Sequence, residues 1–113
     1  MLIRQDEAMP RLTKPPGMPR EVEVAIGLIG NRARAEVLRA LALHDTLTIP
    51  ELADLLGATR QAVQRHLRVL EAQELVHADV PPERRQGRRV QWRANQREVE
   101  KIGTAFGDYI AGR

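Results

Sequence analysis

The stretch that decides the fold runs from Ile49 to Leu70 and reads "IPELADLLGATRQAVQRHLRVL". Thr48 precedes it and forms with Glu51 a capping box, which predicts the start of a short helix. Gly57 is typical of the residue that ends such a helix, and Thr59 is a favoured cap for the next one. Two helices joined by a short turn that contains glycine are typical of a helix-turn-helix. An ordinary helical hairpin is the alternative that this stretch alone leaves open.

The second of these helices, predicted over residues 59–73, has two contrasting faces. At about 100° per residue, Val63, Leu67 and Leu70 form a narrow apolar stripe that should face the core. The opposite face carries Gln61, Gln64, Arg65 and Arg68. Glutamine can reach the edge of adenine, and arginine the edge of guanine, in the major groove of DNA. This polar face therefore favours a helix that reads DNA over an ordinary solvated surface.

The residues before this stretch predict two more helices. Residues 1–18 contain three prolines and no sustained periodicity, which indicates a flexible arm. Pro19 can open a helix, and Asn31 can cap the next one over residues 32–43. The apolar face of the first helix is formed by Val22, Ile26 and Ile29.

Residues 75–94 change from the periodicity of a helix to that of a strand. Apolar and polar residues alternate on both sides of the turn-prone segment "PPERRQG", which predicts a β-hairpin. Trp92 shares its face with Val90 and Ala94, so we expect it to fill the core beneath the hairpin. Four of the six residues 84–89 are arginine, so the tip of the hairpin is basic.

Residues 95–113 predict a last helix with a narrow apolar seam. The seam is formed by Val99, Ile102, Phe106 and Tyr109. These residues are spaced three, four and three apart, and such a narrow seam suits pairing with another helix better than packing on a broad core.

The charge of the chain is concentrated in one region. Residues 60–97 hold nine arginines and four acidic residues, a net charge of +5, whereas residues 1–59 and 98–113 each sum to −1. A region of this sign points to a polyanionic partner.

Composition also disfavours several classes of function. The chain has no Ser and no Cys, which removes the two commonest nucleophiles, and its three His are not spaced as helical pairs. We therefore expect no enzyme, no metal site and no other cofactor. No apolar run approaches the roughly 18 residues of a membrane span, and the N-terminus lacks the apolar core of a signal peptide. With no disulfide possible, the expected location is the cytoplasm.

The residues 29–94, which make up 66 of the 113, resemble the ArsR-like bacterial regulators. The matching motifs are Gly30-Asn31-Arg32, Glu51-Leu52-Ala53, Leu56-Gly57, His66-Leu67 with Leu70, Glu74-Leu75-Val76 and Gly87-Arg88-Arg89-Val90. The resemblance implies a winged helix-turn-helix, a mainly α fold with four helices, a small β-hairpin called the wing, and a fifth helix. MarR-like and GntR-like regulators share parts of the pattern. The chain then divides into an arm (1–18), a DNA-binding domain (19–94) and a dimerisation helix (95–113).

The resemblance further implies a transcriptional regulator, for which we expect repression, with activation as the alternative that the sequence leaves open. Such a protein binds double-stranded DNA in the bacterial cytoplasm, at the nucleoid, as a homodimer on an inverted-repeat site. In this family the terminal helices commonly form the dimer, which assigns that role to Val22, Ile26, Ile29, Val99, Ile102, Phe106 and Tyr109. Many members sense metals through Cys or His, but this chain has no Cys and its last helix has no His. Metal sensing is therefore not expected, and no other effector is indicated.

The predicted DNA contacts divide by position. The base-reading positions are Gln61, Gln64 and Arg65. Thr59 and Arg60, at the start of the helix, should meet phosphate, and Arg68 should contact the backbone one turn later. The wing contacts to flanking phosphates or the minor groove are assigned to Arg84, Arg85, Arg88 and Arg89. The alternative hypothesis is a winged-helix module that binds proteins, or one that serves the nucleoid or replication without regulating a promoter.

Overall fold

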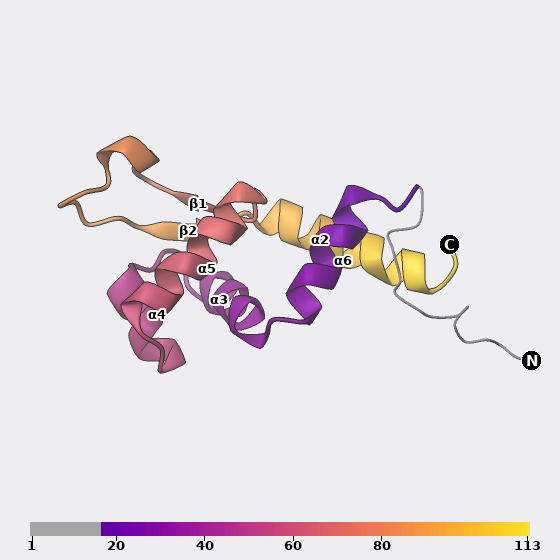
Figure 1. The fold of residues 1–113 in the computed structure, drawn as a ribbon, viewed down its shortest axis with the longest axis horizontal. Coiled ribbons are helices and arrows are strands. Elements are labelled where there is room, and N and C mark those ends of the chain that lie inside the picture. The colour runs from indigo at the N-terminus through magenta and orange to yellow at the C-terminus, as the bar shows by residue number, and fades with distance from the viewer. Residues whose placement is uncertain (1–16) are drawn as a thin grey trace, which may run out of the picture.

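The computed structural model describes residues 17–113, in which a small hairpin projects from a group of helices (Figure 1). The elements in order are α2 (Arg20–Ile29), α3 (Arg32–Leu43), α4 (Ile49–Leu56), α5 (Arg60–Ala72), β1 (Val76–Ala78), the 3-10 turn η1 (Pro82–Arg84), β2 (Trp92–Ala94) and α6 (Gln96–Ile110). The predicted winged helix-turn-helix is confirmed. The predicted arm lies outside the described residues except for residues 17 and 18.

The caps predicted from sequence begin and end the helices of this fold. The Thr48 hydroxyl accepts a hydrogen bond from the Glu51 amide at 3.3 Å, and the Glu51 carboxylate accepts one from the Thr48 amide at 2.8 Å. The bond from the Thr48 amide also holds the pKa of Glu51 below its ordinary value. Asn31 and Thr59 cap α3 and α5 through their side-chain oxygens. Gly57 ends α4 with φ of 62°, a left-handed conformation that glycine adopts without strain.

The apolar stripe of α5 is the centre of the core. Val63, Leu67 and Leu70 are fully buried, as the helical period predicted. Their buried neighbours include Val37, Leu38 and Leu41 of α3, Leu52 and Ala53 of α4, and Leu75, Val76, Trp92 and Ile102 beyond α5. With this stripe fixed inward, the opposite face of α5 must point to solvent.

The hairpin is shorter than the sequence pattern predicted. β1 and β2 pair antiparallel, with Val76 opposite Ala94, and Leu47 adds a bridge to Trp92 through bonds of 2.8 and 3.0 Å. Val80 lies beyond the three paired residues because two prolines follow it. Proline has no amide to donate to a strand partner, so the chain leaves the ladder and enters the turn η1.

The first and last described helices, α2 and α6, pack against each other (Figure 1). They lie at the end of the molecule away from α4 and the tip of the hairpin. Two ion pairs join them, Lys101 to Glu21 at 3.4 Å and Arg20 to Glu98 at 3.6 Å. The narrow seam of the last helix therefore has a helical partner within the same chain. Between residues 17 and 113 no helix has the length and apolarity needed to cross a membrane.

Candidate nucleic-acid interface

The outward face of α5 is the first part of the candidate interface. The four predicted polar residues Gln61, Gln64, Arg65 and Arg68 are exposed, as is Arg60 at the start of the helix. The Thr59 hydroxyl oxygen accepts the Ala62 amide at 3.1 Å and so caps the helix. Its O–H can still donate to a phosphate oxygen, because a hydroxyl both donates and accepts.

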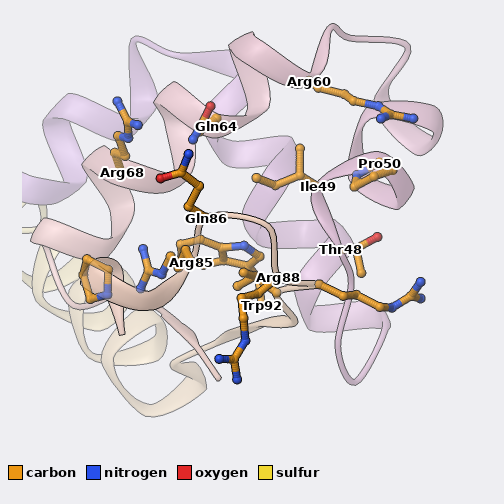
Figure 2. Close-up of a pocket in the computed structure, with 13 residues that line it drawn as sticks. Thr48, Ile49, Pro50, Arg60, Gln64, Arg68, Arg85, Gln86, Arg88 and Trp92 are labelled. Atoms are coloured by element: carbon orange, nitrogen blue, oxygen red, sulfur yellow. The ribbon is translucent and has the colours of Figure 1, made fainter. Parts of the chain in front are cut away.

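A hollow of about 720 Å³ separates α5 from the wing (Figure 2). Its polar lining is formed by Thr48, Arg60, Gln64 and Arg68 on one side and by Arg85, Gln86, Arg88 and Arg89 on the other. Gln86 of the wing points toward Gln64 of α5, with Trp92 beneath them. The fold thus brings five arginines to one concave surface. Gln61, Arg65 and Arg84 do not line this hollow.

Gln86 is a lining residue that the sequence analysis missed. It lies between two arginine pairs at the tip of the hairpin, and as an uncharged residue it does not contribute to the positive charge that marks the tip. Its polar side chain in the turn between Arg85 and Arg88 was the available signal. Gln86 and Gln64 place two amide side chains, one from each element, at the same hollow.

The wing arginines do not behave alike. Arg84 and Arg88 are exposed, and Arg89 is exposed while lying 3.8 Å from the Glu51 carboxylate. Exposed ion pairs of this kind contribute little, so these three side chains can turn toward a polyanion. Arg85 differs because its guanidinium bonds within the protein, although the sequence grouped it with the others.

Arg85 is held by three protein groups at once. Its two terminal nitrogens donate to the two carboxylate oxygens of Glu71 at 3.0 and 2.5 Å, and its Nε donates to the Val80 carbonyl at 2.7 Å. Its guanidinium also lies 4.8 Å from the centre of the Trp92 ring. The Glu71 bonds raise the pKa of Arg85 above its ordinary value. Trp92 is 3% exposed, which confirms its predicted place in the core.

His66 lies beside the apolar stripe of α5 and contacts α3. Arg34 Nε donates to His66 Nδ1 at 3.4 Å, so this nitrogen accepts a hydrogen bond and carries no proton. Burial, and next the positive charges of Arg34 and Arg65, lower the pKa of His66 from its ordinary value. A neutral imidazole is what this site accommodates.

The free energy of unfolding should therefore decrease as the pH is lowered and His66 becomes protonated. A histidine whose pKa is lower in the folded state than in the unfolded state contributes stability that is present above the unfolded-state pKa of 6.5. This stability is lost as the pH falls through the folded-state pKa. We expect urea unfolding to give a lower free energy of unfolding at about pH 5 than at about pH 7.5, and His66→Gln to reduce that difference. His77→Gln, at an exposed position on β1, should leave the difference unchanged. An unaltered pH dependence in His66→Gln would contradict this account.

The seven predicted dimerisation residues occupy two different environments. Val22 and Ile102 are buried within the single chain, and Val99 and Phe106 are half-buried. Ile26, Ile29 and Tyr109 are exposed, and Ile110, which the sequence analysis did not select, is exposed as well. The large apolar side chains that the α2–α6 pair leaves exposed are therefore Ile26, Ile29, Tyr109 and Ile110.

Metal ligands do not gather in the described part of the chain. Among residues 17–113 no three side chains of His, Cys, Asp or Glu are placed to hold a metal ion.

Comparisons with known proteins agree with this fold. The sequence model of the MarR family matches residues 31–89, just over half of the chain. No curated protein sequence matches. An ArsR-like transcriptional regulator from Rhodococcus sp. RHA1 is similar in structure, with a TM-score of 0.63, 26% identity and 81% of each chain covered.

Two more solved structures share the fold. NolR from Sinorhizobium fredii has a TM-score of 0.58 and 24% identity, covering 88% of this chain and 96% of its own. A mutant of ZitR from Lactococcus lactis, solved in complex with DNA, has a TM-score of 0.51 and 24% identity, covering 64% of this chain and 47% of its own.

Fold and site together define a winged helix-turn-helix regulator of transcription. The chain belongs to the MarR family, whose model spans the helix-turn-helix and most of the wing. The predicted resemblance to ArsR-like regulators is confirmed at the level of this wider group of winged-helix regulators.

Proposed function

We propose that the protein is a transcriptional repressor that binds double-stranded DNA as a homodimer on an inverted-repeat site. In the proposed complex α5 enters the major groove, and the wing contacts the flanking backbone or minor groove. Repression then follows from occlusion of a promoter in the bacterial cytoplasm, at the nucleoid. The observation that carries the proposal is the concave surface between α5 and the wing, to which both elements contribute exposed arginine and glutamine.

The roles of the side chains follow from their positions. Gln61, Gln64 and Arg65 are assigned to the bases, because they lie on the exposed face of the first half of α5. Thr59 and Arg60 are assigned to phosphate at the helix N-terminus, where free amides favour anions. The remaining phosphate contacts are assigned to Arg68, Arg84, Arg88 and Arg89. ZitR, a protein of the same fold, is solved in complex with DNA, which supports a duplex as the partner.

The homodimer is assigned to the outward face of the α2–α6 pair. Ile26 and Ile29 on α2 are 47% and 65% exposed, and Tyr109 and Ile110 on α6 are exposed as well. A second copy would bury these side chains and place two α5 helices about one helical turn of DNA apart.

The salt dependence of duplex binding tests the proposal. Several phosphate contacts predict a linear loss of log affinity with log salt, with a slope of about −0.9 for each phosphate neutralised. Fluorescence anisotropy with a labelled duplex between low and moderate salt measures this slope. Absence of duplex binding at low salt would overturn the proposal in favour of a protein-interaction module.

Variants of single residues distinguish the proposed contacts to bases from the proposed contacts to phosphate. We expect Gln64→Ala and Arg65→Ala to flatten the sequence preference found by selection from a random duplex pool. Arg84→Ala should instead weaken all duplexes alike and make the salt slope less steep by about 1. Identical behaviour of the two kinds of variant would contradict the division of roles.

A further inference from the structure

The wing has few backbone ties to the rest of the protein. The ladder ends where Asp79 and Gln91 meet, through the Asp79 amide at 3.0 Å and the Asp79 carboxylate at 2.9 Å. Within the described residues 80–90, the remaining backbone bonds are local to the turn, such as Arg88 to the Arg85 carbonyl at 3.0 Å. Side chains must therefore determine how the wing lies relative to α5.

Arg85 supplies such a side-chain tie. Its fork of two bonds to Glu71 fixes both distance and angle, since both groups are planar and the bonds are parallel. The side chains of Arg85 and Glu71 are 19% and 28% exposed, so water screens this pair less than it screens the exposed pair of Arg89 and Glu51. Contact with the Trp92 ring ties the same guanidinium to the core.

Without its bond to Arg85, the negative charge of Glu71 would be electrostatically unfavourable at this position. It lies in the last turn of α5, where the helix dipole disfavours an anion. It also puts a negative charge on the helix that carries the proposed DNA-reading face. Its bond to Arg85 offsets both effects.

We propose that Arg85 and Glu71 form a latch that positions the wing against α5, and that Arg85 is a positioning residue, not a DNA contact. This inference rests on the proposed DNA-binding function and adds an element that the charge pattern does not show. The latch fixes the exposed Arg88, on the wing side of the hollow, relative to Gln64 and Arg68 on the α5 side. Loss of the latch frees the wing without removing any phosphate contact.

The sign of the effect at Glu71 distinguishes the latch from a simple charge model. Removing an acidic residue near DNA should ordinarily raise affinity for a polyanion. The latch predicts the reverse for Glu71→Gln, a loss of about three- to tenfold, which is the range of coupling between side chains in one network. The control variant Glu83→Gln removes an exposed acidic charge from the wing itself, and it should raise affinity or leave it unchanged.

A double-mutant cycle and the salt slope complete the test. Arg85→Gln should lower affinity as much as Glu71→Gln does, and the double variant should lose no more than either single variant. Arg85→Lys should restore little, because an ammonium group cannot make the paired bonds. The salt slope should stay at the wild-type value in Arg85→Gln. Higher affinity in Glu71→Gln, or a slope in Arg85→Gln less steep by about 0.9, would overturn the proposal.

Hydrogen exchange tests the latch without DNA. The amide of Arg88, and those of the wing around it, should exchange faster in Glu71→Gln than in the wild-type chain, while those of α3 should not change. If no duplex binds but the wing amides still respond, the proposed function fails and the latch stands. Unchanged exchange in the wing would overturn the latch, whatever the DNA result.

Discussion

Replacing Leu67 with alanine should lower the free energy of unfolding by about 2–5 kcal/mol. Leu67 is fully buried in the middle of α5, where helices α3 and α4 and the hairpin meet. Truncation removes three carbons, Cγ and its two methyl groups, from a packed site and leaves a cavity that a small core fills only in part. Domains of this size are stable by about 5–15 kcal/mol, so the variant should approach the limit of folding.

Leu55→Ala is the matched control for this substitution. It makes the same chemical change on the neighbouring helix α4, but Leu55 is 55% exposed. Urea unfolding followed by circular dichroism should give a change within about 0.5 kcal/mol for this variant. Equal losses in the two variants would mean that α5 is not held by its apolar stripe, and the outward direction of its polar face would lose its physical basis.

The helix-turn-helix could be predicted because its signals are local. The capping box at Thr48, the glycine at position 57 and the cap at Thr59 each depend on residues within one or two turns. The strands were predicted too long because alternation continues through Val80, whereas the prolines that follow it remove the donors needed for pairing. The strand pairing therefore ends where the prolines lack amide donors, although the hydrophobic alternation continues.

The role of Arg85 could not be predicted, because it depends on tertiary structure. Arg84 and Arg85 are neighbours with the same side chain, yet one is exposed and the other meets Glu71, 14 residues away. Sequence gives the charge of the tip but not the direction in which the turn η1 points each side chain. For the same reason a helical period identified Val22 and Ile29 as one apolar face, whereas in the tertiary structure Val22 is buried and Ile29 is exposed.

The second large effect is predicted for a substitution of Ile29, the exposed residue at the end of α2. Ile29→Lys should convert the proposed dimer into a monomer and weaken binding to an inverted-repeat site by about 100-fold or more, because two linked half-sites gain from effective concentration. Ile29 is the last residue of α2, where the helix dipole favours a positive side chain, so the helix itself should persist. The added positive charge by itself should raise the affinity for DNA. A loss of affinity would therefore come from the loss of the dimer and not from the charge.

Leu43→Lys separates dimer loss from the effect of the charge. Leu43 ends α3 as Ile29 ends α2, and the two are 66% and 65% exposed, but Leu43 lies outside the α2–α6 pair. Sedimentation should give a dimer for this control and a monomer for Ile29→Lys, while binding to a single half-site should be similar in both. If Ile29→Lys stays dimeric and binds the inverted repeat as the wild type does, the dimer must use another surface, and the spacing of the two α5 helices must be derived again from it.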